Sequence, residues 1–339
     1  MANALHQLAS SDANNASIFQ YLVDKGLSWD SEDNNGNGLF NYAARGSNMD
    51  MLKLCVSKGL NHSTLNTIGE NSLFYASYAP KRGAVKLQVF HYMESLGLEV
   101  DLVNWEGKTP LHNAIRYADV ELIDYFLQRG VNINQIDENG NTTLLNSIGG
   151  PIANVKKVLP LVANTNHKNK KGYTPLTLAV QRGSKEVYDF LVKNELDVNI
   201  KDTEGNNLIY HAFESYRDSN EESFDYLITS LSNQLGINND KVFFGGNTLA
   251  HIAVKKNSPY LLSRAISLGT DLNHKNEDGV TPLHMAAMST NDDSLILALL
   301  NSGADKSILT AFKESAYDLA TQNELLTKNR IAVDILKTQ

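Results

Sequence analysis

A short phrase recurs along this chain at an interval of about 33 residues. It is clearest in residues 107–114, which read GKTPLHNA, and it returns in residues 279–286, which read GVTPLHMA. A fixed period of this size indicates one small supersecondary unit that is stacked on itself many times. The repeat therefore constrains the fold more than any other feature of the sequence.

The turn glycine of each copy, or the residue in its place, marks where a module starts. These residues are Met1, Gly36, Gly69, Gly107, Gly140, Gly172, Gly205, Gly246, Gly279 and Lys313. Most modules are 32–35 residues long, but those that begin at Gly69 and Gly205 have 38 and 41 residues. Because no residues are left over, we predict a single repeat domain over residues 1–339 with a C-terminal cap at residues 313–339.

Each module contains the signals for two short helices and a turn. The Thr109 hydroxyl can accept a hydrogen bond from the first helical turn, and Pro110 has the φ that suits the first helical position. A second helix is predicted over residues 120–127, where apolar residues recur at helical spacing before Gly130, a suitable C-cap. Residues 137–140, which read DENG, then predict a turn into the next module. The predicted unit is helix, helix and hairpin-like finger.

With this unit, the chain resembles the ankyrin repeat family over essentially its whole length. The best matches are the modules that begin at Gly107, Gly172 and Gly279, which carry TPLH, TPLT and TPLH after the turn. The resemblance implies an all-α repeat solenoid of about ten stacked ankyrin helix-turn-helix modules with hairpin-like finger loops. Residues 38–40 and 71–73 depart from the Thr-Pro-Leu pattern and leave the helix geometry of their modules open.

The extra residues of the two long modules are expected in surface loops, where added length costs little. In the first module they lie around residues 79–83, between the two helices. In the second they lie around residues 216–222 and, in the finger, around residues 238–241. Two interpretations stand, namely sequence drift at a tolerant site and a contact loop at a binding surface.

The sequences at the two ends of the chain predict a truncated start and a capped end. Residues 1–6 enter a module at its helix-start position and present Leu5 and Leu8 with no module before them. We expect a start truncated from a longer array, whose uncovered apolar end either frays or self-associates. At the other end, residues 313–320 form a degenerate module, and residues 329–337 predict a helix with a polar outer side, as in a capping repeat.

Composition excludes several classes of function. No apolar run approaches the roughly 18 to 20 residues of a membrane-spanning helix, so we expect no membrane insertion. The net charge of −8 argues against nucleic acid as the main partner. A single cysteine, Cys55, excludes an internal disulfide and a cysteine-based zinc site. Its place on the apolar stripe of a second helix predicts a buried, inert thiol.

Motifs for catalysis are missing from the sequence. It has no glycine-rich phosphate loop ending in Lys-Ser/Thr, no His-Glu-x-x-His, no Cys-x-x-Cys and no Gly-x-Ser-x-Gly. His112, His251 and His284 share one repeat position, and the ankyrin resemblance implies that each imidazole bonds the neighbouring backbone and Thr side chain. We therefore expect no enzyme activity, no metal and no cofactor.

Function is expected instead on the concave surface of an ankyrin array, formed by the fingers and the exposed sides of the first helices. The family's variable positions give the partner-binding set Arg45, Tyr78, Trp105, Lys108, Arg116, Tyr117, Lys170, Lys171, Tyr173, Arg182 and Tyr216, with Gln181, Lys255 and Lys256 at further such positions. Aromatic and Arg side chains are typical of binding hot spots. Packing between adjacent fingers is the alternative for Trp105 and the tyrosines. The basic members indicate a partner with an acidic or polar patch.

Two functions from different classes follow. The first is a non-enzymatic scaffold that binds a partner protein or peptide through its concave surface. The alternative is an interaction module of a larger enzyme or toxin whose catalytic domain lies upstream of residue 1. The irregular modules and abundant Asn are also loosely similar to long exported bacterial ankyrin repeat proteins, which implies an exported or periplasmic location, with a cytoplasmic location as the alternative.

Overall fold

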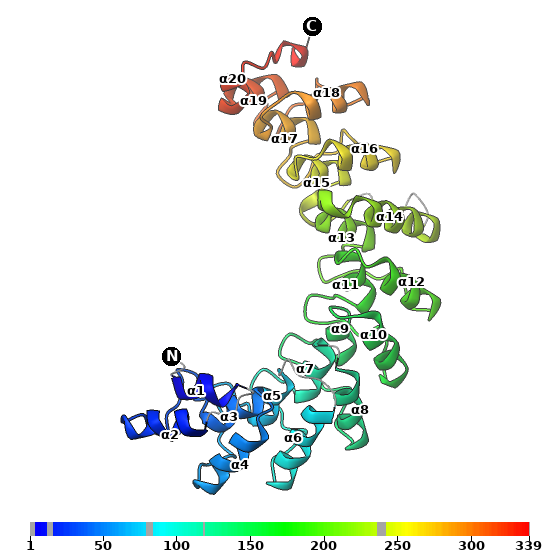
Figure 1. Cartoon of the computed structure of the whole chain (residues 1–339). Coiled ribbons are helices and arrows are strands. Elements are labelled where there is room, and N and C mark those ends of the chain that lie inside the picture. The colour runs from blue at the N-terminus through cyan, green and yellow to red at the C-terminus, as the bar shows by residue number, and fades with distance from the viewer. Residues whose placement is uncertain (1–3, 12–15, 79–83, 118, 236–241, 339) are drawn as a thin grey trace. The chain divides into compact units, whose positions relative to one another are not determined.

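The computed structural model describes residues 4–11, 16–78, 84–117, 119–235 and 242–338, which fold into successive helix pairs (Figure 1). The chain divides into two compact units, unit 1 (Met1–Lys170) and unit 2 (Lys171–Gln339). Within each unit the first helices of successive pairs pack side by side, and second helices of neighbouring pairs also contact one another. The described residues contain no strand. The predicted all-α repeat architecture is confirmed.

Unit 1 consists of five helix pairs in its described part. They are α1 (Ala4–Ala9) with α2 (Ala16–Asp24), α3 (Leu39–Arg45) with α4 (Met49–Ser57), α5 (Ser72–Ser77) with α6 (Ala84–Ser95), α7 (Pro110–Arg116) with α8 (Val120–Gln128), and α9 (Thr143–Ser147) with α10 (Ile152–Val158), followed by the 3-10 turn η1 (Leu159–Leu161).

Unit 2 continues the same pattern. Its helices are α11 (Pro175–Gln181) with α12 (Lys185–Lys193), α13 (Leu208–Ser215) with α14 (Glu221–Leu235), α15 (Leu249–Lys255) with α16 (Pro259–Ser267), α17 (Pro282–Ser289) with α18 (Ser294–Asn301), and α19 (Ala316–Gln322) with α20 (Glu324–Lys328). Three 3-10 turns, η2 (Asp218–Asn220), η3 (Phe244–Gly246) and η4 (Asp334–Leu336), lie between or after these helices.

The helices follow the period of the sequence. From Gly36 to Lys313, each first helix begins three residues after the turn residue of its module. The turn glycines from Gly36 to Gly279 have φ values between 71° and 83°, a left-handed conformation that glycine adopts without steric cost. Lys313 adopts the same conformation, with φ of 66°, in spite of its side chain.

The modules without the Thr-Pro-Leu step keep this register because other groups cap their helices. Asn71 takes the place of Thr before α5, and its side-chain oxygen accepts a hydrogen bond from the Leu73 N–H at 3.0 Å. Before α3, the Gly38 N–H donates to the side-chain oxygen of Asn41 at 3.3 Å. Of the predicted insertions, residues 79–83 and 238–241 lie outside the described residues, whereas residues 216–222 include η2 and the start of α14.

Fingers of neighbouring modules are joined by backbone hydrogen bonds. The N–H to carbonyl pairs are Thr67 to Asn35, Trp105 to Ile68, Glu138 to Glu106 and Lys170 to Asn139 in unit 1, and Thr203 to Lys171 and Glu277 to Gly245 in unit 2, with N···O distances of 2.7–3.3 Å. An Asp or Asn begins many fingers and accepts from the N–H groups two and four residues later, as Asn104 does from Glu106 and Lys108. Part of the abundant Asn therefore stabilises finger turns.

Both ends of the chain correct an expectation. Leu5 is fully buried, because Leu5 and Ala9 lie on the same face of α1 and this helix packs against α3. Of the two leucines predicted to be uncovered, only Leu8 is half-buried. The helix predicted over residues 329–337 is wrong. α20 ends at Lys328, Arg330 has a left-handed φ of 56° that stops the helix, and only η4 follows.

Candidate functional site

The repeated histidines have structural partners, as the sequence analysis predicted. In the module of Gly107, the Thr109 N–H donates to Nδ1 of His112 at 3.1 Å, and the Thr109 hydroxyl lies 3.1 Å from the same atom. His251 and His284 repeat this arrangement with their own threonines. Burial lowers the pKa of His112 to about 4, so its imidazole is neutral near pH 7. These histidines hold helix starts in place.

Cys55 is fully buried, which confirms its predicted position in the core. Burial raises the pKa of its thiol to about 12, so the thiolate is strongly disfavoured. In the described part of the chain, no three side chains of His, Cys, Asp or Glu come together as a metal site. The described helices include none that is both long and apolar enough to cross a membrane.

Trp105 is the most prominent predicted residue of the fingers. Its side chain is 71% exposed and its ring lies over the preceding finger, where a Cβ on Gly69 would come within 2.8 Å of the indole. Trp105 therefore fits both interpretations, packing between fingers and partner binding. Its ring packs on the preceding finger, and most of its side-chain surface is still exposed. Lys108 lies beside it on the same finger, half-buried and paired with Glu106 at 2.7 Å. This ion pair offsets much of the charge that Lys108 could offer an acidic partner.

Four tyrosines of unit 1 form a row along the first helices, with ring centroids 6.0–6.2 Å apart in sequence order. This tyrosine row consists of Tyr42, Tyr75, Tyr78 and Tyr117. The first three rings are half-buried, and Tyr117 is 44% exposed. Tyr78 and Tyr117 belong to the partner-binding set predicted from the sequence, whereas Tyr42 and Tyr75 do not. Their signal was present, because Tyr42 and Tyr75 both lie six residues after a turn glycine.

Buried or half-buried carboxylates hold two hydroxyls of the row. Tyr42 donates to Asp33 at 2.8 Å, and Tyr78 donates to Glu70 at 3.0 Å. Glu70 is only 3% exposed and also accepts from the amide of Asn104 in the next finger at 3.3 Å. Burial raises the pKa of the Glu70 carboxyl, and it raises the pKa of both hydroxyls above the ordinary tyrosine value. These hydrogen bonds therefore fix the positions of the Tyr42 and Tyr78 rings in the row.

Two other predicted residues of unit 1, Arg45 and Arg116, lie beside the row. Arg45 and Arg116 are the last residues of α3 and α7, and both are exposed. The Arg116 guanidinium lies 5.9 Å from the centre of the Tyr117 ring, within the range of a cation–π contact. Lys170 is exposed on a finger. Unit 1 therefore places a basic side chain, Arg116, beside the exposed Tyr117 ring.

The predicted partner-binding residues of unit 2 differ in their exposure. Lys171 is exposed and lies 6.0 Å from the centre of the half-buried Tyr173 ring, which packs edge-on against His211. Arg182 is exposed at the end of α11. Tyr216 is only 7% exposed, because its ring stacks on Tyr260 at 5.3 Å. The Tyr216 ring serves packing and offers little surface to a partner.

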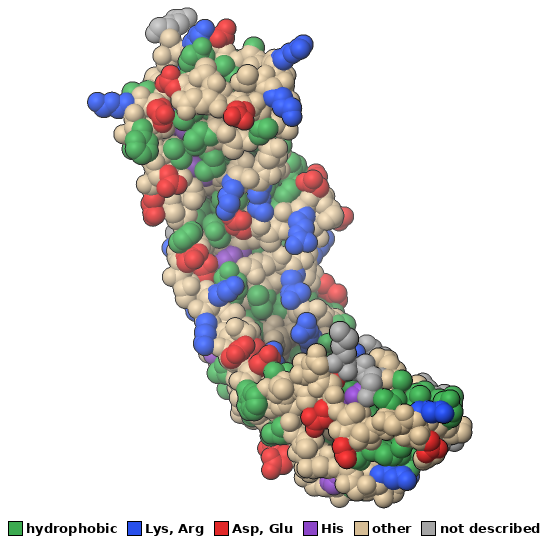
Figure 2. All heavy atoms as spheres, turned by 90° about the vertical axis from the view of Figure 1, so that its left-hand side faces the viewer, with side chains coloured by type: hydrophobic (Ala, Val, Ile, Leu, Met, Phe, Trp, Pro, Cys, Tyr) green, Lys and Arg blue, Asp and Glu red, His purple; other side chains and the backbone are tan. Residues whose placement is uncertain are grey.

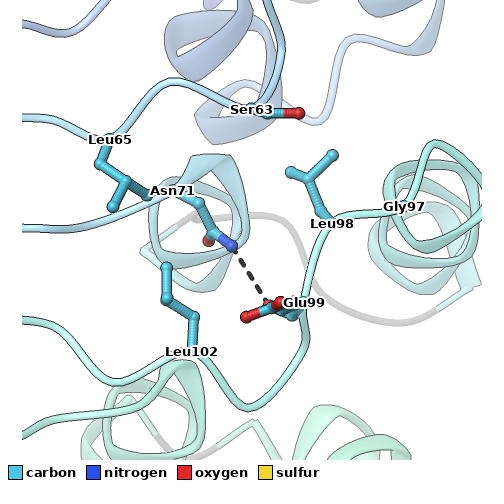
Figure 3. Close-up of a pocket in the computed structure, with 7 residues that line it drawn as sticks. All are labelled: Ser63, Leu65, Asn71, Gly97, Leu98, Glu99 and Leu102. Carbon is cyan, nitrogen blue, oxygen red and sulfur yellow. Dashed lines mark hydrogen bonds between the residues drawn. The ribbon is translucent and has the colours of Figure 1, made fainter.

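Two hollows are notable among the described residues. In unit 1, a space of about 240 Å³ lies between successive connecting loops, with Leu65, Leu98 and Leu102 around it and a hydrogen bond from the Asn71 amide to the Glu99 carbonyl along one side (Figure 3). Its lining mixes these leucines with the polar Ser63, Asn71 and Glu99. In unit 2, a larger hollow of about 570 Å³ lies at the ends of α11, α13 and α15. Its lining is mostly polar and charged.

Comparisons with known proteins agree with this architecture. A model of ankyrin repeats in three copies matches residues 147–238 and 215–310, and a model of one ankyrin repeat matches residues 106–135. The human ASB11 ankyrin repeat domain superimposes with a TM-score of 0.53 and 24% identity, and the match covers 68% of this chain and 99% of that domain. This likeness shows the fold.

Three curated relatives match this chain over 22–38% of their own length. Human transient receptor potential cation channel subfamily A member 1 is 20% identical over 85% of this chain and 29% of its own length. Human Rabankyrin-5 is 25% identical over 68% of this chain and 22% of its own length. Putative ankyrin repeat protein FPV031 of fowlpox virus is 32% identical over 39% of this chain and 38% of its own length. These animal and viral relatives give no support to the expected bacterial origin.

The family models together match more than half of the chain, and their repeats coincide with the helix pairs of the structure. Ankyrin repeats are a type of protein–protein interaction module. The chain belongs to the ankyrin repeat family.

Proposed function

We propose that this chain is a non-enzymatic scaffold that binds a partner protein or peptide through its fingers and the exposed sides of its first helices. The observation that carries the proposal is the combination of Trp105 and the tyrosine row in unit 1. Trp105 exposes 71% of its side chain and Tyr117 exposes 44%. Large aromatic side chains of this kind are the usual anchors of protein interfaces.

Preorganisation of these side chains supports the same function. Tyr78 is held by the buried Glu70, and Trp105 rests on the finger of Gly69, so neither ring needs to be ordered when a partner binds. Ordering a flexible side chain costs about 0.5–1.5 kcal/mol at an interface, and a preset surface avoids most of this loss. Arg45, Arg116, Lys170, Lys171 and Arg182 add positive charge, which favours a partner with an acidic or polar patch and predicts slower association in added salt.

The proposal is tested by capturing partners from extracts of the native organism and measuring their affinity for single variants. We expect Trp105→Ala and Tyr117→Ala each to weaken binding by about 2 kcal/mol or more, which is roughly 30-fold. Tyr21→Ala is the matched control, because Tyr21 is 59% exposed in the same unit but lies on the second helix α2. If folded Trp105 and Tyr117 variants keep full affinity for the captured partner, the proposed surface is wrong.

A further inference from the structure

The hollow of about 570 Å³ in unit 2 concentrates positive charge. We call it the cationic pocket, and its lining includes Arg182, Glu214, Tyr216, Arg217, Asn220 and Lys256. Three of these are cations and one is a carboxylate, which leaves a net charge of plus two in a chain whose total charge is −8. Figure 2 shows Lys and Arg side chains gathered on this face over α11, α13 and α15.

The inserted segment of the 41-residue module builds one wall of the pocket. Five residues, 216–220, separate α13 from α14, whereas three residues, 182–184, separate α11 from α12. The Arg217 N–H donates to the Asn220 side-chain oxygen at 3.0 Å, and the Asn220 N–H donates to the Arg217 carbonyl at 2.9 Å. A Cβ on Gly183 would lie 3.3 Å from the Asn220 amide nitrogen. The insertion is thus packed against the preceding module, next to Arg182.

The cations of the pocket are available to a ligand. Within the described part of the chain, the guanidinium groups of Arg182 and Arg217 form no salt bridge or hydrogen bond. Lys256 Nζ lies 3.9 Å from one carboxylate oxygen of Glu214, and Lys255 Nζ lies 3.7 Å from the other. Both contacts are long, and Glu214 is shared between the two lysines. Arg182 and Lys256 also follow helix carboxyl ends, where a cation offsets the partial negative charge of the helix. Arg217 has no such role, because it precedes η2 in the insertion.

From this geometry we infer that the cationic pocket binds a phosphorylated side chain, phosphoserine or phosphothreonine, presented by an extended segment of a partner protein. A phosphate monoester carries a charge of about −1.5 to −2 at neutral pH, so it can engage two of the three cations of the lining, whereas a single carboxylate carries only one charge. Guanidinium groups bind phosphate oxygens through paired N–H donors. The inference rests on the proposed scaffold function and assigns it a partner whose binding depends on phosphorylation.

The test uses capped tripeptides, Gly-phosphoserine-Gly, Gly-Glu-Gly and Gly-Ser-Gly, titrated into the whole chain while the Arg Nε–Hε resonances are recorded by NMR. We expect the Arg182 and Arg217 resonances to shift with the phosphoserine peptide, at least tenfold weaker binding of the Glu peptide, and no shift with the Ser peptide. Arg217→Ala should weaken phosphoserine binding by about tenfold or more. Lys193→Ala is the matched control, because it removes an exposed cation of unit 2 on α12, outside the pocket.

Equal binding of the Glu and phosphoserine peptides would overturn the preference for a dianion. Phosphoserine binding that survives Arg217→Ala would overturn the assignment of the pocket. Arg217 is exposed, and an unchanged circular dichroism spectrum confirms that its variant is folded. Because the probes are small and unit 1 is not altered, failure here leaves the scaffold function standing, and that function is tested separately with the Trp105 and Tyr117 variants.

Discussion

Lys86 and Asp119 form a buried ion pair that links neighbouring modules of unit 1. Lys86 Nζ lies 2.9 Å from Asp119 Oδ2, and the two side chains are 2% and 5% exposed. Lys86 also donates to the Ser77 carbonyl at 3.3 Å, while the other Asp119 oxygen caps α8 by accepting from the Leu122 N–H at 3.1 Å. One pair of charges therefore ties α5, α6 and α8 together.

The energy of this pair is set by two opposing terms. At 2.9 Å the Coulomb attraction is about 6 kcal/mol for an effective dielectric constant of roughly 20, and the desolvation of both ions offsets much of it. Removal of one partner leaves the other charge buried without compensation, which costs about 3–5 kcal/mol. We therefore expect this loss for Lys86→Met. The double variant Lys86→Met/Asp119→Asn should lose much less, because Asn is uncharged and still caps the helix.

Urea unfolding followed by circular dichroism measures these losses, and hydrogen exchange of the α8 amides shows whether the effect is local. The control is Lys157→Met, which removes the ion pair between Lys157 and Asp124. Those side chains are 24% and 48% exposed, so we expect a loss of only about 0–1 kcal/mol. If Lys86→Met costs no more than Lys157→Met, burial does not control the strength of this pair and the reasoning is refuted.

Two further predictions concern buried titratable groups. A thiol reagent should label Cys55 only in denaturant, because the thiol is fully buried and its pKa is raised to about 12; rapid labelling of the folded chain would contradict this. The buried His112 has a pKa of about 4 in the fold, against about 6.5 when unfolded, so the unfolded chain takes up a proton first as the pH falls. The stability from neutral His112 is full above about pH 6.5 and is lost toward pH 4, by up to about 3 kcal/mol. His112→Gln should show a smaller decrease in urea stability between these pH values than the parent chain, and an unchanged decrease would argue against a depressed pKa.

Local signals in the sequence were sufficient for the repeating unit. The turn glycines, the Thr-Pro step at residues 109–110 and the apolar spacing after residue 120 each act over a few residues of the same chain segment. Their conformations depend on φ preferences and on hydrogen bonds to nearby backbone groups, as the contact between Thr109 and His112 shows. This local character is why the helix starts, the role of the histidines and the burial of Cys55 could be predicted.

The exposure of the proposed binding residues depends on contacts between modules. Tyr216 and Tyr117 both follow or end a first helix, yet Tyr216 stacks on Tyr260 of the next module and is buried, whereas Tyr117 stays exposed. The tyrosine row and the cationic pocket likewise join residues about 30 or more positions apart, such as Tyr42 with Tyr75 and Arg182 with Arg217. A sequence period places such residues at equivalent positions, but their exposure and partners depend on which side chains the adjacent module supplies. Only tertiary packing decides that, because burial and charge pairing are properties of the space between modules.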